Sequence, residues 1–202
     1  NKYLVEKFIE KNRKEKKFFI CIVANISPVK GILNLLKTAN KLKLYSNKIV
    51  FITVGAIHKS QMNYHAYLIQ MMKKLKIKNF FFLKSRKDVR PLLKAMDIYV
   101  CSSSNESSPL SVWEAMSMKK AIVSTDVGDV KNFIKNNING FIVKTDDPND
   151  LANAIRKLIE NPKLRFIFGK SVREVVKNKL NLKICVSHYE QAYKSIVMDD
   201  KY

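Results

Sequence analysis

The chain has 202 residues, of which 47% are hydrophobic and 27% charged, a composition typical of a globular protein rather than a disordered or fibrous one. This length suits one well-buried domain. The longest apolar runs, such as FFICIVA at 18–24, fall far short of the roughly 20 residues that span a bilayer. The sequence therefore excludes a membrane-spanning helix.

The three cysteines are widely spaced and form no CxxC pair. This pattern argues against a disulfide framework and a zinc site, and the three histidines show no ligand spacing. We therefore expect no metal and a reducing, cytoplasmic location. The chain begins at Asn1 and shows no signal segment, so we expect it to be a fragment.

The formal net charge of +21 predicts an anionic partner: nucleic acid, an acidic membrane surface or a phosphorylated ligand. A coding bias toward Lys, Asn, Ile and Phe explains the same charge without any partner. We expect the run KNRKEKK at 11–17 to be a solvated face or a connector. Nucleic acid is the weakest candidate, because the chain has no RNA-binding aromatic motif, zinc finger or convincing helix-turn-helix.

Short apolar runs alternate with segments of helical spacing. The first run, KFFICIVA at 17–24, is typical of a buried strand, and the apolar spacing over 32–42 predicts a helix after it. Further strands are expected at 48–55, 80–83, 97–102, 121–125 and 140–143, and further helices at 62–76, 86–96 and 109–118. This alternation predicts an α/β fold, a doubly wound, mostly parallel, Rossmann-like sheet of about six strands.

Helices alone are expected after the last strand. Asp147 suits an N-cap and Pro148 the first helical position, and an apolar stripe follows them as far as a helix end near Asn161. Two further helices are predicted at 163–178 and 182–197.

The carboxyl ends of the strands carry the candidate ligand-binding residues, because open α/β sheets bind ligands there. Asn25 and Lys30 follow the first strand, and Gly55 ends the second. Lys30 is expected at the start of a helix. A lysine facing a helix N-terminus suits a phosphorylated ligand.

The loop after the fourth strand leads into a second helix N-terminus, with Ser108 as the expected N-cap and Pro109 as the first helical residue. The backbone amides of Ser108 and Leu110, together with Lys30, are expected to hold a diphosphate.

Two carboxylates accompany this expected phosphate site. Glu106 lies in the loop and Glu114 eight positions later in the helix, where side chains lean toward the N-terminus. Carboxylates accept hydrogen bonds from hydroxyl groups, so we expect one to serve a ribose and the other a sugar. Each residue alone has an ordinary structural explanation. Their shared place at one sheet edge favours a binding site.

The segment SSSNESSPLSVWEAMSMKKAIVSTDVGDVKNFIKNNINGFIV at 102–143 resembles the donor-binding core of family 4 (group 1) glycosyltransferases, which have the GT-B fold. Two glutamates with seven residues between them, Glu-Ala-Met and Ser-Thr-Asp-Val-Gly carry the resemblance. It extends back to SPVKG at 27–31 and forward to the helix after Asp147, nearly the whole chain.

The resemblance implies retaining transfer of a sugar from a nucleotide diphosphate donor without a metal ion or other cofactor. By carry-over, Lys30 binds the diphosphate, Glu106 the donor sugar and Glu114 the ribose. The amides near Ser107 and Ser108 bind phosphate or sugar. Lys30 and Glu106 are the expected catalytic residues.

Two departures from the family pattern bear on the donor. Ala24-Asn25 stands where the family commonly has Gly-Arg, and Ser107 replaces a glycine. We therefore expect weak binding, with Asn25, Gly55 and Leu110 among the donor contacts.

The resemblance also sets the expected domains: 1–16 as the end of an interdomain connector and 17–202 as the donor domain, with the N-terminal acceptor domain absent. We expect a saccharide or lipid-linked acceptor and little transfer by this chain alone. Two other functions remain open, a non-catalytic nucleotide-sugar-binding scaffold and, ranked lower, a nucleotide-sugar epimerase. Peripheral contact with anionic lipid is a further hypothesis, through a basic surface at Arg173, Lys177, Lys179 and Lys183.

Overall fold

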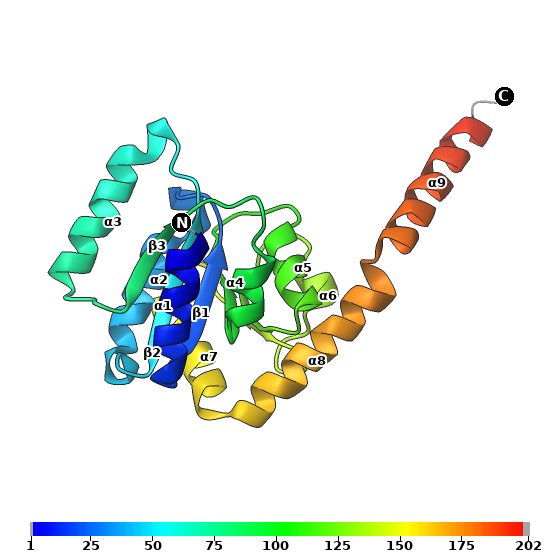
Figure 1. The fold of residues 1–202 in the computed structure, drawn as a ribbon. Helices are drawn as coiled ribbons and strands as arrows, with labels where there is room; N and C mark the ends of the chain where they lie inside the picture. The colour runs from blue at the N-terminus through cyan, green and yellow to red at the C-terminus, as the bar shows by residue number, and fades with distance from the viewer. Residues whose placement is uncertain (1, 200–202) are drawn as a thin grey trace.

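Six parallel strands form one sheet at the centre of the molecule (Figure 1). The computed structural model describes residues 2–199. The strands are β1 (Phe18–Val23), β2 (Ile49–Gly55), β3 (Phe80–Lys84), β4 (Ile98–Cys101), β5 (Ala121–Thr125) and β6 (Phe141–Val143). Their spatial order is β3-β2-β1-β4-β5-β6, so the chain extends the sheet first to one side of β1 and then to the other. The predicted α/β fold is confirmed.

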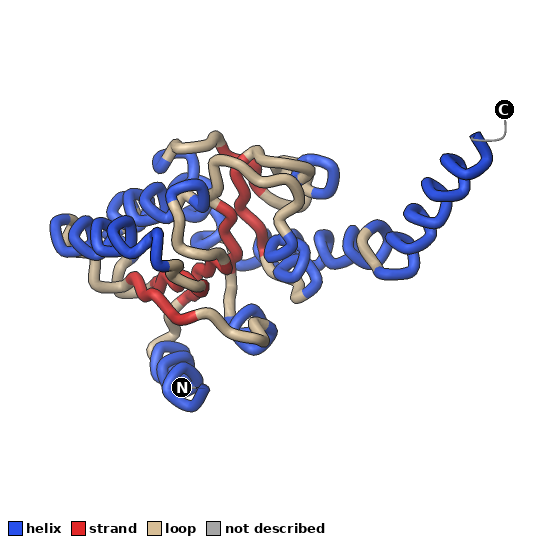
Figure 2. The backbone as a smooth tube through the Cα atoms, turned by 90° about the horizontal axis from the view of Figure 1, so that it is seen from above, coloured by secondary structure: helices blue, strands red, loops and turns tan. Residues whose placement is uncertain are grey.

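Helices cover both faces of the sheet (Figure 2). Within the described residues they are α1 (Lys2–Lys14), α2 (Ile32–Lys41), α3 (Met62–Lys74), α4 (Arg90–Ala95), α5 (Leu110–Ser117), α6 (Val130–Phe133), α7 (Pro148–Glu160), α8 (Pro162–Lys179) and α9 (Leu182–Asp199), with short 3-10 helices at Pro28–Lys30, Lys43–Tyr45 and Lys59–Gln61. On one face α2, α3 and α7 pack together, and on the other lie α1, α4 and α5.

Alternate residues of the central strands supply the two halves of the core. In β1, Ile20 and Ile22 pack with α2 and α7, whereas Phe19 and Cys21 pack with α4. Because both faces are covered, the strand has no polar alternation and is a continuous apolar run. This is the physical reason that the run was recognisable in the sequence.

The starts of α4 and α2 lie further along the chain than predicted. The helix expected at 86–96 is limited to Arg90–Ala95, because the Asp88 carboxylate accepts a hydrogen bond from the Arg90 amide at 3.0 Å and 85–89 remain a loop. Lys30 lies in a 3-10 turn, and α2 begins at Ile32 after Gly31. The short helix α6 was not predicted.

The first helix is attached to the sheet. The Phe8 ring lies edge-on to Phe81, with centroids 4.8 Å apart, and the Arg13 guanidinium forms an ion pair with Asp97 at 2.9 Å. Asp97 also accepts a hydrogen bond from the Phe19 amide at 2.8 Å. The helix α1 thus contacts the sheet through Phe8 and Arg13, and the expected boundary at residue 16 stays a prediction.

The C-terminal helices begin where expected. The Asp147 carboxylate accepts hydrogen bonds from the amides of Asn149 and Asp150 at 2.9 and 3.0 Å, so it caps α7 as predicted. α9 extends away from the body of the molecule (Figure 1), and its exposed apolar side chains include Leu182, Tyr189 and Tyr193. Within the described part of the chain, no helix has the length and apolarity needed to cross a bilayer.

Candidate functional site

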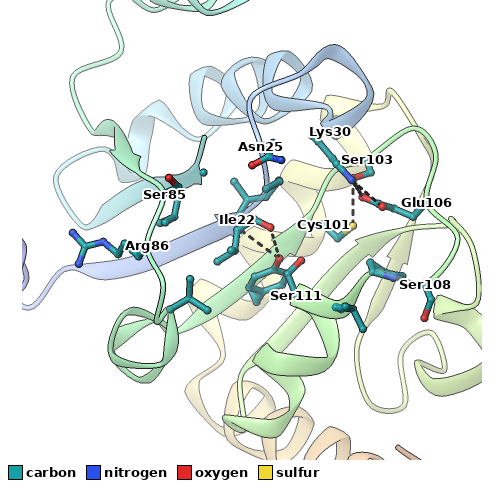
Figure 3. A pocket seen from close by; sticks show the side chains of 18 residues that line it. Ile22, Asn25, Lys30, Ser85, Arg86, Cys101, Ser103, Glu106, Ser108 and Ser111 are labelled. Atoms are coloured by element: carbon teal, nitrogen blue, oxygen red, sulfur yellow. Dashed lines mark hydrogen bonds and ion pairs between the residues drawn. The ribbon is translucent and has the colours of Figure 1, made fainter. Parts of the chain in front are cut away.

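A cavity of about 440 Å³ lies at the carboxyl edge of the sheet, between the loops that follow β1, β3 and β4. The strand order reverses between β1 and β4, the place where open α/β sheets form a ligand crevice. The volume falls in the range of about 300 to 1,000 Å³ typical of small-molecule sites. Figure 3 shows its lining side chains.

Lys30 and Glu106 meet at one side of this cavity. The Lys30 Nζ lies 2.7 and 2.9 Å from the two carboxylate oxygens of Glu106. The Ser103 hydroxyl donates a third hydrogen bond to the same carboxylate at 2.7 Å (Figure 3). The structure thus brings together the two residues predicted to be catalytic, although they lie 76 positions apart in the chain.

Close backbone packing holds the Lys30 loop against the loop after β4. The Ser102 hydroxyl donates to the Lys30 carbonyl at 3.0 Å, and the Ser104 amide donates to the Val29 carbonyl at 2.8 Å. Gly31 has φ +64°, and a Cβ there would lie 1.8 Å from the Ser102 carbonyl oxygen. Only glycine permits this approach, so the sequence Lys-Gly fixes where the lysine stands.

The turn after β5 holds the other side of the Glu106 loop. Gly128, at φ +51°, lets its backbone approach Ser107, whose carbonyl accepts a hydrogen bond from the Asp129 amide at 3.0 Å. The Ser108 hydroxyl donates to Asp129 at 3.0 Å and accepts from the Trp113 indole at 3.2 Å. These contacts fix the loop that leads into α5.

The start of α5 differs from the prediction by one residue. Pro109 is the N-cap, and α5 begins at Leu110 with no side-chain cap. Ser108 is not the cap, because its hydroxyl is engaged with Asp129 and Trp113. Uncapped first-turn amides remain able to donate to an anion. Ser108, Pro109 and Leu110 all line the cavity.

Asn25 and Gly55 line the cavity on the β1 and β2 side. The Asn25 side-chain oxygen accepts a hydrogen bond from the Ala56 amide at 3.2 Å. A Cβ at Gly55 would lie 1.9 Å from the Ala24 carbonyl oxygen, so the two strand ends touch through backbone. These two predicted contacts therefore share one wall.

Two predicted donor contacts do not line the cavity. Glu114 is exposed on α5, and Ser107 is exposed in the loop, each outside the set of residues that surround the hollow. The expectation that Glu114 binds a ribose stays a prediction, as does the role of the Ser107 amide.

The sequence reasoning missed several lining residues. Arg86 follows β3, and with Lys30 and Glu106 it completes the charged side chains of the lining, two cations and one carboxylate. Burial raises the pKa of Cys101 and raises that of Tyr99 well above its usual range, so the cavity floor is uncharged near neutral pH. The cavity therefore carries a positive balance, which suits an anionic ligand.

Comparisons with known proteins agree on one family. Residues 5–175 match the family described as Glycosyl transferases group 1. An uncharacterized glycosyltransferase of Methanocaldococcus jannaschii is 29% identical over 199 residues, 93% of this chain and 48% of that protein. The UDP-Gal:alpha-D-GlcNAc-diphosphoundecaprenol alpha-1,3-galactosyltransferase of Escherichia coli is 28% identical over 189 residues, 92% of this chain and 48% of that protein.

Solved structures extend the likeness to the fold. Anabaena HepE, whose structure holds UDP and glucose, is 21% identical and superimposes with a TM-score of 0.85 over 93% of this chain and 52% of its own. The chain spans about half the length of the curated relatives it matches. The expected fold, one half of a GT-B enzyme, is confirmed. Because the family match covers residues 5–175, the chain belongs to the group 1 glycosyltransferases.

Proposed function

We propose that this chain is the donor-binding domain of a retaining glycosyltransferase and that its ligand is a UDP-sugar. The observation that carries the proposal is the pairing of Lys30 and Glu106 in one cavity, at 2.7 Å, beside the uncapped start of α5. A cation and free amides suit a diphosphate, and a carboxylate suits the hydroxyl groups of a sugar. UDP is chosen because the names of the Escherichia coli and Anabaena relatives carry it.

The proposed reaction follows from what the family resemblance implies. The acceptor hydroxyl oxygen bonds to the anomeric carbon on the face from which the donor phosphate leaves. The bond from that carbon to the phosphate oxygen breaks, and the acceptor proton passes to the leaving phosphate. Lys30 stabilises the charge that develops on the diphosphate, while Glu106 orients the sugar.

The acceptor belongs to the whole enzyme. We propose a saccharide or a lipid-linked saccharide, because the Escherichia coli relative is named for a diphosphoundecaprenol-linked substrate. A basic surface near the junction of α8 and α9 could bind an anionic membrane through Arg173, Lys177, Lys179 and Lys183. One of these side chains, Lys177, already pairs with Glu174 at 2.9 Å. We propose that donor binding and sugar transfer require no metal ion.

Titration calorimetry with the purified chain tests donor binding. We expect UDP and at least one of UDP-glucose, UDP-galactose and UDP-N-acetylglucosamine to bind, more tightly than GDP, with or without EDTA. Lys30→Met should weaken UDP binding about 10- to 150-fold, because it removes a charged hydrogen-bonding partner.

Lys37→Met is the matched control, since Lys37 is an exposed lysine of the neighbouring helix α2 and does not line the cavity. Absence of heat with every nucleotide would reject the donor site and favour a scaffold. Equal losses in the two lysine variants would reject the assigned role of Lys30.

A further inference from the structure

Ser103 is a buried hydroxyl that contacts the Glu106 carboxylate. Its exposed fraction is 1%, and its Oγ donates to Glu106 Oε1 at 2.7 Å. The Thr125 hydroxyl donates to the Ser103 carbonyl at 2.6 Å, and the Cys101 thiol lies 3.7 Å from the Ser103 hydroxyl. The backbone of Ser103 is thus held by Thr125, while the Ser103 hydroxyl group points toward Glu106.

Among the described residues, two side chains of unequal length donate hydrogen bonds to the Glu106 carboxylate. Lys30 reaches it from the facing loop on a long flexible chain whose exposed fraction is 27%, whereas Ser103 is short and held by its own backbone. The exposed fraction of the Glu106 side chain is only 16%, so hydrogen bonds from the protein replace most of the water around its carboxylate.

A diphosphate competes with Glu106 for Lys30. If the proposed function holds, the ammonium group of Lys30 moves toward the phosphate oxygens, and the carboxylate loses part of its contact with it. Ser103 cannot follow, because its backbone is held by Thr125. The hydroxyl is then the protein donor that still fixes the orientation of the carboxylate.

We propose that Ser103 is a positioning residue that keeps Glu106 aimed at the donor sugar while Lys30 holds the diphosphate. This inference rests on the proposed function and adds a prediction that the proposed function does not make. Loss of the Ser103 hydroxyl should impair recognition of the sugar and spare recognition of the nucleotide.

The test compares UDP with a UDP-sugar on the same variants by titration calorimetry, using the panel of UDP-glucose, UDP-galactose and UDP-N-acetylglucosamine. Ser103→Ala should weaken the sugar-bearing ligand about tenfold and change UDP by less than about twofold. Ser104→Ala is the matched control, because it keeps the Ser104 amide that holds the Val29 carbonyl and removes only an exposed hydroxyl that does not contact Glu106. It should leave both affinities unchanged.

A double-mutant cycle shows whether Ser103 acts through Glu106. In a Glu106→Ala background, Ser103→Ala should have no further effect on the UDP-sugar. Thr125→Val, which removes the donor behind Ser103, should shift the ratio of the two affinities in the same direction as Ser103→Ala, so a poorly folding alanine variant does not stop the test.

Each other outcome has a defined meaning. Equal weakening of UDP and UDP-sugar by Ser103→Ala, or a full effect in the Glu106→Ala background, shows a merely structural serine and overturns the inference alone. No binding of UDP or any UDP-sugar to the unaltered chain overturns the proposed function, and the inference with it.

Discussion

Asn25 occupies the position where the family pattern commonly has an arginine. Its side-chain oxygen instead accepts a hydrogen bond from the Ala56 amide. We expect Asn25→Arg to strengthen UDP binding about 10- to 150-fold, because it adds a third cation, besides Lys30 and Arg86, to the cavity that we propose holds the diphosphate. Calorimetry measures the change. Asn25→Ala, which loses the Ala56 contact without adding charge, is the control, and a folded arginine variant with unchanged affinity contradicts the expectation.

The meeting of Lys30 and Glu106 was predictable because both follow strands whose carboxyl ends share one edge of the sheet, although each residue alone has an ordinary structural explanation. Their roles toward a ligand stay predictions. Ser103 was missed because serine at a strand end is common. Its contact with Glu106 arises from a turn whose shape cannot be read from the amino-acid sequence. For Glu114, helical projection gives only the face, and the structure leaves the side chain exposed.

Among the elements, α7 owes its start to Asp147. The amide of Asp150, and after it that of Asn149, lowers the pKa of the Asp147 carboxyl by donating hydrogen bonds to the charged form. A folded-state pKa below the unfolded one adds stability above the unfolded value of about 3.9, and this stability is lost as the pH falls through the folded value.

Asp147→Ala should therefore lower the urea midpoint at pH 7, and the gap to the unaltered chain should narrow below about pH 4. Urea unfolding followed by circular dichroism from pH 3 to 7 measures it. Asp147→Asn keeps an acceptor for the same amides but does not titrate in this range. Its urea midpoint should therefore lack the part of the fall below about pH 4 that protonation of Asp147 causes in the unaltered chain. A gap that stays constant with pH rules out the titration of Asp147 as its cause.

The starts of helices were predictable where a capping residue marks them. α7 was placed correctly because Asp147 and Pro148 mark its start. α4 was expected too early, because the sequence alone does not show the contact of the Asp88 carboxylate with the Arg90 amide that marks the later start. The strand order was not predicted at all, since six apolar strands carry no sign of which pairs with which.

At the scale of the whole molecule, the chain spans about half of its relatives, and we expect residues 1–202 alone to transfer little sugar. An acceptor that is not positioned forfeits about 7 to 11 kcal/mol of proximity effect. Incubation of a radiolabelled UDP-sugar with a panel of saccharide and lipid-linked acceptors measures transfer. Repeated turnovers by the purified chain contradict the expectation.

The contact between Gly31 and the Ser102 carbonyl has a consequence for the thermodynamics of binding. Because Lys30 and Glu106 stand on loops whose backbones touch, the two charges acquire their relative position when the chain folds. A ligand then encounters groups that are already ordered, and little conformational entropy of the backbone is left to lose on association. We therefore expect the strength of donor binding at this edge of the sheet to depend on side-chain exchange around Lys30 rather than on loop ordering.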